Sequence, residues 1–189
     1  MKLREFALAG LYAGLIASPQ EKAPREKMTE NPPVLKEFER RVSDYVKLHK
    51  TARSEVHPVK ATNSPGEIKE YEHRLATRIR VSWPPDRHGT IFDAEISVEF
   101  RRLIAATMKS PKGNRIRESL LRAAPAGLPV VRVGDTYPDN LPLQSMPPSL
   151  LLNLPKLPPE VEYRLVGNDL VLRDIEANLI VDFVTKAIP

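Results

Sequence analysis

The sequence predicts an α+β fold in which a small N-terminal helical bundle of three to four helices is followed by a C-terminal three-stranded antiparallel β-meander. Apolar residues recur at three-to-four spacing through residues 34–123, which is typical of amphipathic helices. After this region the helical spacing ends, and short apolar runs on either side of Gly167-Asn168 indicate the two strands of a hairpin. With 41% hydrophobic residues among 189 and no cysteine, the chain can bury a core, but packing alone must stabilise it.

The first 18 residues are predicted to be a signal peptide. Met1-Lys2-Leu3-Arg4 is basic, residues 6–17 are apolar or small, and Ser18-Pro19 follows. This order is typical of an export signal, and the apolar run is shorter than the about 20 residues that a membrane-spanning helix needs. The mature chain is expected to begin near Ser18 and to be periplasmic or extracellular. The alternative is an amphipathic or buried first helix of a cytosolic protein.

A flexible lead and a first helix are predicted next. Residues 19–30 contain two prolines and almost no apolar side chain, which is typical of a lead. The helical region then covers residues 31–124. Its first helix is predicted to begin at Asn31-Pro32-Pro33, with asparagine as a cap and proline in the first turn, and to end near Lys50. The residues of its apolar face are Val34, Leu35, Phe38, Val42, Tyr45, Val46 and His49.

Three further helices are predicted. Ser64-Pro65-Gly66-Glu67 provides a serine cap, a first-turn proline and a glutamate that can bond back, and Trp83-Pro84-Pro85 ends this second helix. The third begins at Thr90 or Asp93 and ends near residue 109, and the fourth covers about 114–123. Since each helix has one apolar stripe, we expect the stripes to pack against each other. The stripes are Ile68, Tyr71, Leu75 and Ile79; Ile96, Phe100, Leu103, Ile104 and Met108; and Ile116, Leu120 and Leu121.

Residues 125–189 are predicted to be a proline-rich loop and the β-meander. Val130, Val131 and Val133 make a short β-like run, and a helical turn is expected at residues 149–154. Strands are predicted at residues 163–166, 170–172 and 179–184, with Gly167-Asn168 as a two-residue hairpin turn. Regular alternation in the last strand would turn Val181 and Phe183 inward and Asp182 to solvent.

The tail also resembles a known group. Leu157-Pro158-Pro159, Tyr163-Arg164, Val166-Gly167-Asn168-Asp169, Leu172 and Leu179-Ile180-Val181-Asp182 resemble the C-terminal module of periplasmic proteins associated with nickel and cobalt homeostasis. This resemblance covers roughly 30 residues and implies an envelope location and a small meander, but no metal site. Residues 31–189 as a whole are similar to a group of uncharacterised exported bacterial proteins, which implies no activity.

No catalytic, cofactor-binding or metal site is predicted, and no cofactor is expected. The histidines are isolated, and the nearest pairing, Glu70 with His73, offers only two of the three or four ligands that zinc needs. We expect a partly buried neutral imidazole at His49 and surface or helix-packing roles for the others. The four histidines are His49, His57, His73 and His88.

The remaining candidates for chemistry have structural interpretations. Acidic residues at the start of a helix interact favourably with its dipole, and serines before proline or a helix act as caps or in turns. Aromatic residues beside prolines are more often core or lid residues than binding residues. These candidates are the acids Asp93, Glu95, Glu99, Asp174, Glu176 and Asp182, the serines Ser64, Ser110 and Ser149, and the aromatics Trp83, Tyr137, Tyr163 and Phe183.

The sequence favours an exported, non-enzymatic protein that binds another macromolecule or stabilises an assembly. The net charge of +5 is modest, and Arg74, Arg78 and Arg80 are interpreted as a solvated helix face, so no nucleic-acid partner is expected. A sheet of three strands cannot hide both edges, so a protein partner can add to it as another strand.

Two alternatives to a binding protein stay open. An enzyme of an unrecognised family would bring two or more of the groups His73, His88, Asp93 and Glu99 into one pocket. A metal-stress protein would bring His49, His57 or His73 together with carboxylates at ligand distance.

Overall fold

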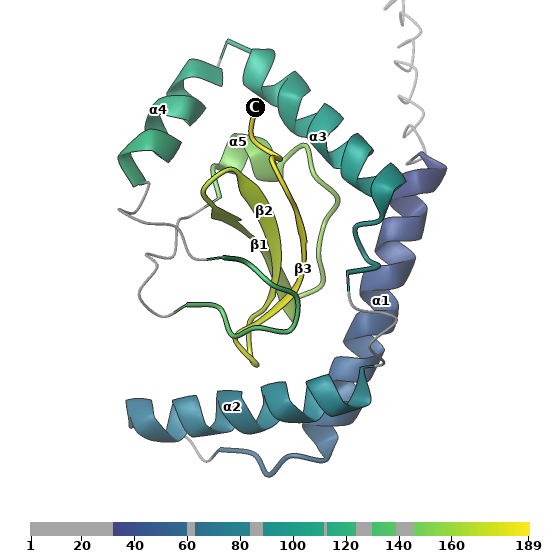
Figure 1. Cartoon of the computed structure of the whole chain (residues 1–189), viewed down its shortest axis with the longest axis vertical. Coiled ribbons are helices and arrows are strands. Elements are labelled where there is room, and N and C mark those ends of the chain that lie inside the picture. Colours follow the sequence, from purple (N-terminus) through teal and green to yellow (C-terminus); the bar gives the residue numbers. More distant parts are fainter. Residues whose placement is uncertain (1–31, 60–62, 84–88, 112, 124–129, 139–145) are drawn as a thin grey trace, which may run out of the picture. The chain divides into compact units, whose positions relative to one another are not determined.

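The computed structural model describes residues 32–59, 63–83, 89–111, 113–123, 130–138 and 146–189. They all belong to one compact unit, residues 31–189. The predicted signal peptide and lead lie outside the described residues. Along the described chain the helices come first and the three strands last, which confirms the predicted α+β class and the C-terminal meander (Figure 1).

Helix α1 covers Pro33–Ser54 and is longer than predicted. Pro32 occupies the position before the helix without a side-chain cap, and the predicted cap Asn31 lies outside the described residues. The helix continues past Lys50 because Ala52, which is fully buried, extends the apolar face by another turn. The buried residues of α1 are Leu35, Phe38, Val42, Tyr45, Val46, His49 and Ala52.

The other helices are α2 (Pro65–Ser82), α3 (Ala94–Lys109), α4 (Gly113–Ala123) and the short α5 (Pro148–Leu151). The predicted caps are confirmed, because the side chain of Ser64 accepts the Glu67 N–H and that of Asp93 accepts the Ile96 N–H at 2.9 Å. Ile68, in the first turn of α2, is 42% exposed and does not join the buried stripe. Of the described helices, none combines the length and apolar content that crossing a bilayer requires.

The sheet has the order β1-β2-β3, with β1 at Val161–Val166, β2 at Asp169–Asp174 and β3 at Leu179–Val184. Both pairs are antiparallel, and the predicted two-residue turn joins β1 to β2, with Gly167 at a φ of 60° as its first residue. Figure 1 shows β2 between β1 and β3, so that each of these two strands has one outer edge.

The predicted β-like run at Val130, Val131 and Val133 is wrong, because those residues form no strand. The backbone that reaches the sheet lies slightly later, at residues 134–137, where a turn leads into an isolated bridge between Thr136 and Leu179. Gly134 N–H donates to Ile180 C=O, Ile180 N–H donates to Asp135 C=O, and Tyr137 N–H donates to Asn178 C=O, each at 2.8 Å. This segment therefore covers part of the outer edge of β3.

A β-bulge in β3 changes which residues face the helices. Leu172 pairs with Asp182 but Arg173 pairs with Ile180, so Val181 is an extra residue in the ladder. Strict alternation fails there, and Asp182 lies on the same face as the buried residue Leu172 and is only 3% exposed. The prediction that Asp182 points to solvent is therefore wrong.

One hydrophobic core joins the helices to the sheet. The ring centroid of Phe38 in α1 lies 4.8 Å from that of Phe100 in α3 and 6.5 Å from that of Tyr163 in β1. Phe92, just before α3, stacks on Phe38 at 5.3 Å. The helical stripes thus pack on the sheet as well as on each other, and this arrangement fixes the orientation of β1.

Candidate functional site

His49 is the centre of a buried polar cluster that joins α1 and α2 to the turn after β2. Its Nδ1 lies 2.6 Å from Asp174 Oδ2 and its Nε2 lies 3.2 Å from Glu176 Oε2. Tyr45 donates its hydroxyl to the same Asp174 oxygen, and Tyr71 donates to Glu176, each at 2.7 Å. His49 is 1% and Asp174 0% exposed, so a substrate in solution does not reach the imidazole or this carboxylate.

The neighbouring charges decide the protonation of this cluster. Burial lowers the pKa of His49, but the hydrogen bond and charge of Asp174, and then those of Glu176, outweigh it and raise the pKa above its ordinary value. Because a carboxylate oxygen lies beside each of the two ring nitrogens, the geometry favours an imidazolium, whereas a neutral ring was predicted. Burial and the charge of Asp174 raise the pKa of Tyr45 well above its usual range, so its phenol remains a donor.

This cluster does not have the arrangement of a metal site. The two carboxylates bond to opposite nitrogens of the ring, so they cannot share one ion with a single ring nitrogen. Among the residues that the structure describes, no group of three or more His, Asp or Glu could hold a metal ion. His57 and His73 are exposed, His88 lies outside the described residues, and Glu70 bonds to Arg74 at 2.6 Å.

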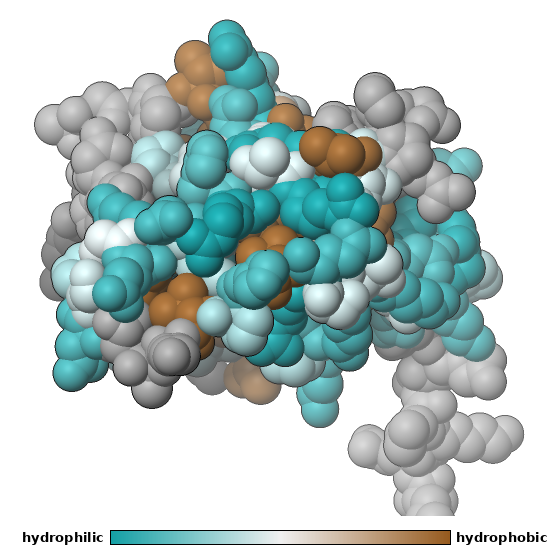
Figure 2. Space-filling model, turned by 90° about the horizontal axis from the view of Figure 1, so that it is seen from below, coloured by the Kyte–Doolittle hydropathy of each residue, from teal (hydrophilic) through white to brown (hydrophobic). Residues whose placement is uncertain are grey.

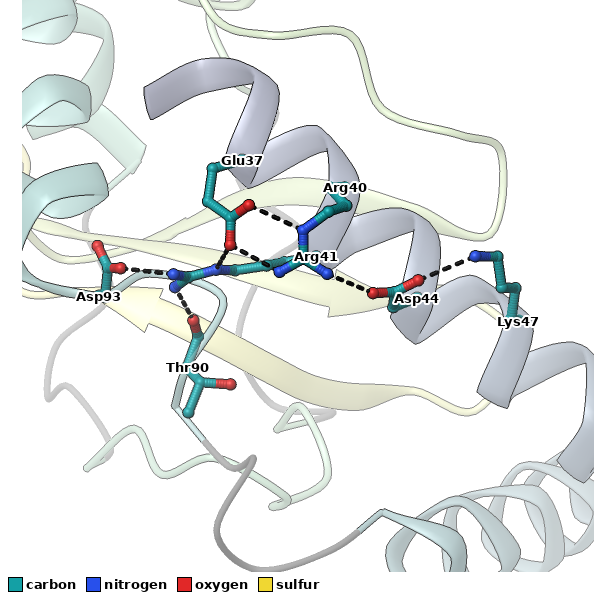
Figure 3. Close-up of polar contacts among 7 residues, drawn as sticks. All are labelled: Glu37, Arg40, Arg41, Asp44, Lys47, Thr90 and Asp93. Atoms are coloured by element: carbon teal, nitrogen blue, oxygen red, sulfur yellow. Dashed lines mark hydrogen bonds and ion pairs between the residues drawn. The ribbon is translucent and has the colours of Figure 1, made fainter. Parts of the chain in front are cut away.

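A second polar cluster lies along the outer side of α1 and reaches the start of α3 (Figure 3). Arg41 Nη2 lies 2.7 Å from Asp93 Oδ2, its Nε donates to Glu37 at 2.7 Å, and its Nη1 donates to the Thr90 carbonyl. Hydrogen bonds from Arg40 and Arg41 lower the pKa of Glu37 to about 2. The other members of this cluster are Asp44 and Lys47.

The carboxylates near α3 hold the backbone and neighbouring side chains. Asp93 caps α3 and also pairs with Arg41, and Glu99 pairs with Arg102 at 2.6 Å, which agrees with the predicted structural role. Asp182, predicted to be exposed, accepts the N–H groups of Phe92 and Phe183 at 2.8 Å each. Burial raises the pKa of Asp182 although these bonds lower it. Asp182 therefore fixes the segment before α3 against β3.

The predicted arginine stripe and the predicted aromatics have partners within the chain. Arg78 and Arg80 bond to residues outside α2, whereas Arg74 bonds within this helix, and the buried aromatics belong to the core, as predicted. The arginine contacts are Arg74 with Glu70, Arg78 with Glu55, and Arg80 with the Gly134 carbonyl at 2.6 Å. The aromatics Trp83, Tyr137 and Tyr163 are buried and Phe183 is half-buried, while Ser110 ends α3 and Ser149 lies in α5.

One surface groove, of about 500 Å³, lies between α1 and the end of α2. Tyr45 and Trp83 line it, and Arg40, Arg41 and Asp44 contribute charges. Of the four groups whose convergence would indicate an enzyme, His73, Asp93 and Glu99 do not line this groove, and His88 lies outside the described residues.

A second groove, of about 540 Å³, follows the outer edge of β1. Consecutive strand residues 161–164 line one side, and residues 155–157 with Met146 and Leu151 line the other. Because consecutive residues of a strand point to opposite faces, a groove lined by all of them lies at the edge of the sheet. Figure 1 shows that this edge is on the side of the sheet away from β3.

The backbone at this edge has unused hydrogen-bonding groups. Ile175 N–H donates to Glu160 C=O at 3.0 Å. Because hydrogen-bonded pairs alternate along an antiparallel pair of strands, the N–H and C=O groups of Glu162, Arg164 and Val166 point toward β2. Tyr163 and Leu165 therefore direct their N–H and C=O groups outward. No described residue accepts a hydrogen bond from either N–H. Tyr163 lines the groove, whereas Leu165 does not and is only 1% exposed, so the open part of the edge lies at Tyr163. Such an edge is a template for pairing with another strand.

The side chains beside this edge carry alternating charges in fixed positions. Arg164 donates from Nε and Nη2 to Glu162, and Arg173 donates from Nη1 to the same carboxylate, all at 2.6 Å. The guanidinium of Arg173 also lies over the Tyr137 ring at 5.3 Å. Glu162 and Arg164 are each about one-fifth exposed, so they are held in place yet accessible.

The rest of the described surface offers scattered hydrophobic residues. Figure 2 shows one face of the molecule, where hydrophilic residues dominate and hydrophobic ones lie in separate spots. The four most exposed large hydrophobic residues of the described chain lie apart in the sequence: Leu152 after α5, Val130 before the sheet, Val81 in α2 and Val98 in α3. The edge of β1 is therefore the site with the most specific geometry.

Comparisons of the chain with known protein families, with curated proteins and with solved structures find no match. The similarity of the tail to periplasmic nickel and cobalt proteins accordingly stays a prediction.

Proposed function

We propose that the protein is an exported, non-enzymatic binding protein that takes up an extended segment of a partner protein as an additional strand along β1. The single observation that supports this proposal is the outward edge of β1 at Tyr163, which lines the groove and whose N–H has no acceptor among the described residues. Strand addition derives affinity from main-chain hydrogen bonds and specificity from the alternate side chains.

The edge chemistry defines the segment that fits. An antiparallel partner needs a base opposite Glu162 and an acid opposite Arg164, because opposite charges across a strand pair are favourable and like charges are not. The positions between them face Val161, Tyr163 and Leu165, which are buried on the helix-covered side of the sheet, so small apolar residues suit them. The partner pattern from N- to C-terminus is therefore apolar, acidic, apolar, basic, apolar.

Export is tested by fractionation and N-terminal sequencing of the purified protein. We expect a mature product in the envelope or medium that begins near Ser18, because a signal peptidase cuts after small residues that follow the apolar run. A chain that retains Met1 and stays in the cytosol would contradict export while leaving the edge proposal intact.

Binding at the edge is tested by titration with a blocked synthetic peptide, acetyl-Val-Glu-Val-Lys-Val-amide. We expect saturable binding that is about tenfold tighter than that of the control peptide Val-Lys-Val-Glu-Val, which has the same composition with the charges exchanged. A third peptide, with N-methyl groups on the amides that face β1, should not bind because it cannot donate to the edge.

The protein variants for this titration follow from the same geometry. Arg164→Glu leaves acids at both positions 162 and 164 and should abolish the preference between the two charged peptides, whereas the exchanged double variant E162R/R164E should reverse it. Arg102→Glu, the same charge change at an exposed position on α3, should leave the preference unchanged. Equal affinity for all three peptides, or no binding of any, would exclude strand addition at β1.

A further inference from the structure

We propose that the partner strand is β1 of a second copy of this chain, so that two sheets join about a two-fold axis at Tyr163. This inference rests on the proposed function, because it names the partner for the same edge. An isologous contact of this kind requires a surface that is complementary to itself.

The sequence of β1 has that self-complementarity. Val161-Glu162-Tyr163-Arg164-Leu165 reads apolar, acidic, aromatic, basic, apolar. In an antiparallel pair centred on Tyr163, Glu162 of each copy lies opposite Arg164 of the other. Shifting the register by two residues in either direction places either Glu162 or Arg164 opposite its own copy, which brings like charges together.

The hydrogen-bond phase agrees with the same register. The N–H and C=O groups of Tyr163 and Leu165 point away from β2, and so does the C=O group of Val161. The Val161 N–H donates to the Pro158 carbonyl at 3.2 Å. Pairing about Tyr163 joins the two Tyr163 residues by reciprocal hydrogen bonds, and these bonds need no group of Leu165, which is only 1% exposed. Glu162 and Arg164 then occupy non-hydrogen-bonded positions, where facing side chains are closest.

The side chains are already oriented for this contact. Arg164 bonds to Glu162 of its own chain through Nε and Nη2, and no described residue bonds to its Nη1. Glu162 is also held by Arg173, so little conformational freedom is lost when a second strand arrives.

The first test is the oligomeric state of charge variants by sedimentation equilibrium. We expect a reversible dimer whose dissociation constant rises at least about tenfold in Glu162→Arg and in Arg164→Glu. The exchanged double variant E162R/R164E should recover dimerisation, and so should an equimolar mixture of the two single variants. Arg102→Glu is the control for added charge, and circular dichroism confirms that each variant is folded.

The second test fixes the register without relying on charge. The chain contains no cysteine, so Glu162→Cys in one preparation and Arg164→Cys in another introduce a single thiol each. Oxidation of the mixture should give a disulfide-linked dimer in much higher yield than oxidation of either alone, because only residues 162 and 164 face each other within bonding distance.

The outcomes separate the two proposals. A protein that is monomeric at all concentrations but binds the Val-Glu-Val-Lys-Val peptide overturns self-pairing and leaves strand addition standing. A monomer that binds no peptide overturns both. A dimer that is insensitive to the charge variants and shows no preferred cross-link overturns self-pairing at β1.

Discussion

Replacing Asp174 by alanine is expected to lower the free energy of unfolding by about 3–5 kcal/mol, because it breaks a buried charged pair. Asp174 is fully buried and accepts hydrogen bonds from His49, from the Tyr45 hydroxyl and, through Oδ1, from the Ala177 N–H at 2.8 Å. Alanine leaves all these buried donors without an acceptor, which costs the desolvation of each. Urea unfolding monitored by circular dichroism measures the loss.

The pH dependence of that loss identifies its cause. A folded-state pKa of His49 raised above its usual 6.5 contributes stability that is fully present below pH 6.5 and is lost as the pH rises through the raised value. The difference between wild type and Asp174→Ala should therefore be larger at about pH 6 than at about pH 9. Asp174→Asn, which keeps one acceptor oxygen, should lose less. A loss below about 1 kcal/mol that is independent of pH would contradict this role of Asp174.

Replacing Phe100 by alanine is expected to cost about 3–5 kcal/mol, the range for truncating a large buried aromatic residue. Phe100 is fully buried at the centre of the core, with ring centroids of Phe38 at 4.8 Å, Phe92 at 5.0 Å and Tyr163 at 6.0 Å. Its removal leaves a cavity between α1, α3 and β1, so the cost includes lost dispersion contacts as well as lost burial.

The matched control for Phe100 is on the same helix. Val98 is 63% exposed, so Val98→Ala should change the free energy of unfolding by no more than about 0.5 kcal/mol. Equal effects of the two substitutions in urea unfolding would contradict the placement of the core between α3 and the sheet.

Local signals in the sequence predicted most of the fold. The cap and proline at Ser64-Pro65 and the cap at Asp93 mark helix starts through contacts within a single turn, and Gly167-Asn168 marks a hairpin in the same way. These features were predicted correctly because their physical causes lie within a few residues.

The misplaced residues depend on contacts far apart in the chain. Asp182 turns inward because of the bulge at Val181, for which the regular apolar pattern of that strand contains no signal. The pairing of His49 with Asp174 joins residues 125 positions apart, so helical spacing indicated the burial of His49 but not its charged partner. The opposite charges of Glu162 and Arg164, two residues apart on one strand, were present in the sequence. They could be interpreted as a pairing surface only once the structure showed that the outer edge of β1 has no neighbouring strand.

The measurement that tests the account most directly is hydrogen exchange at the backbone amides of β1, with and without the Val-Glu-Val-Lys-Val peptide. In a dilute sample we expect Tyr163 to exchange faster than Glu162 and Arg164, whose N–H groups bond to β2, and to become protected when the peptide or a second copy is bound. A Tyr163 amide that is as protected as its neighbours in the dilute monomer, and unchanged by the peptide, would show that the edge of β1 is not available and would contradict the proposed function.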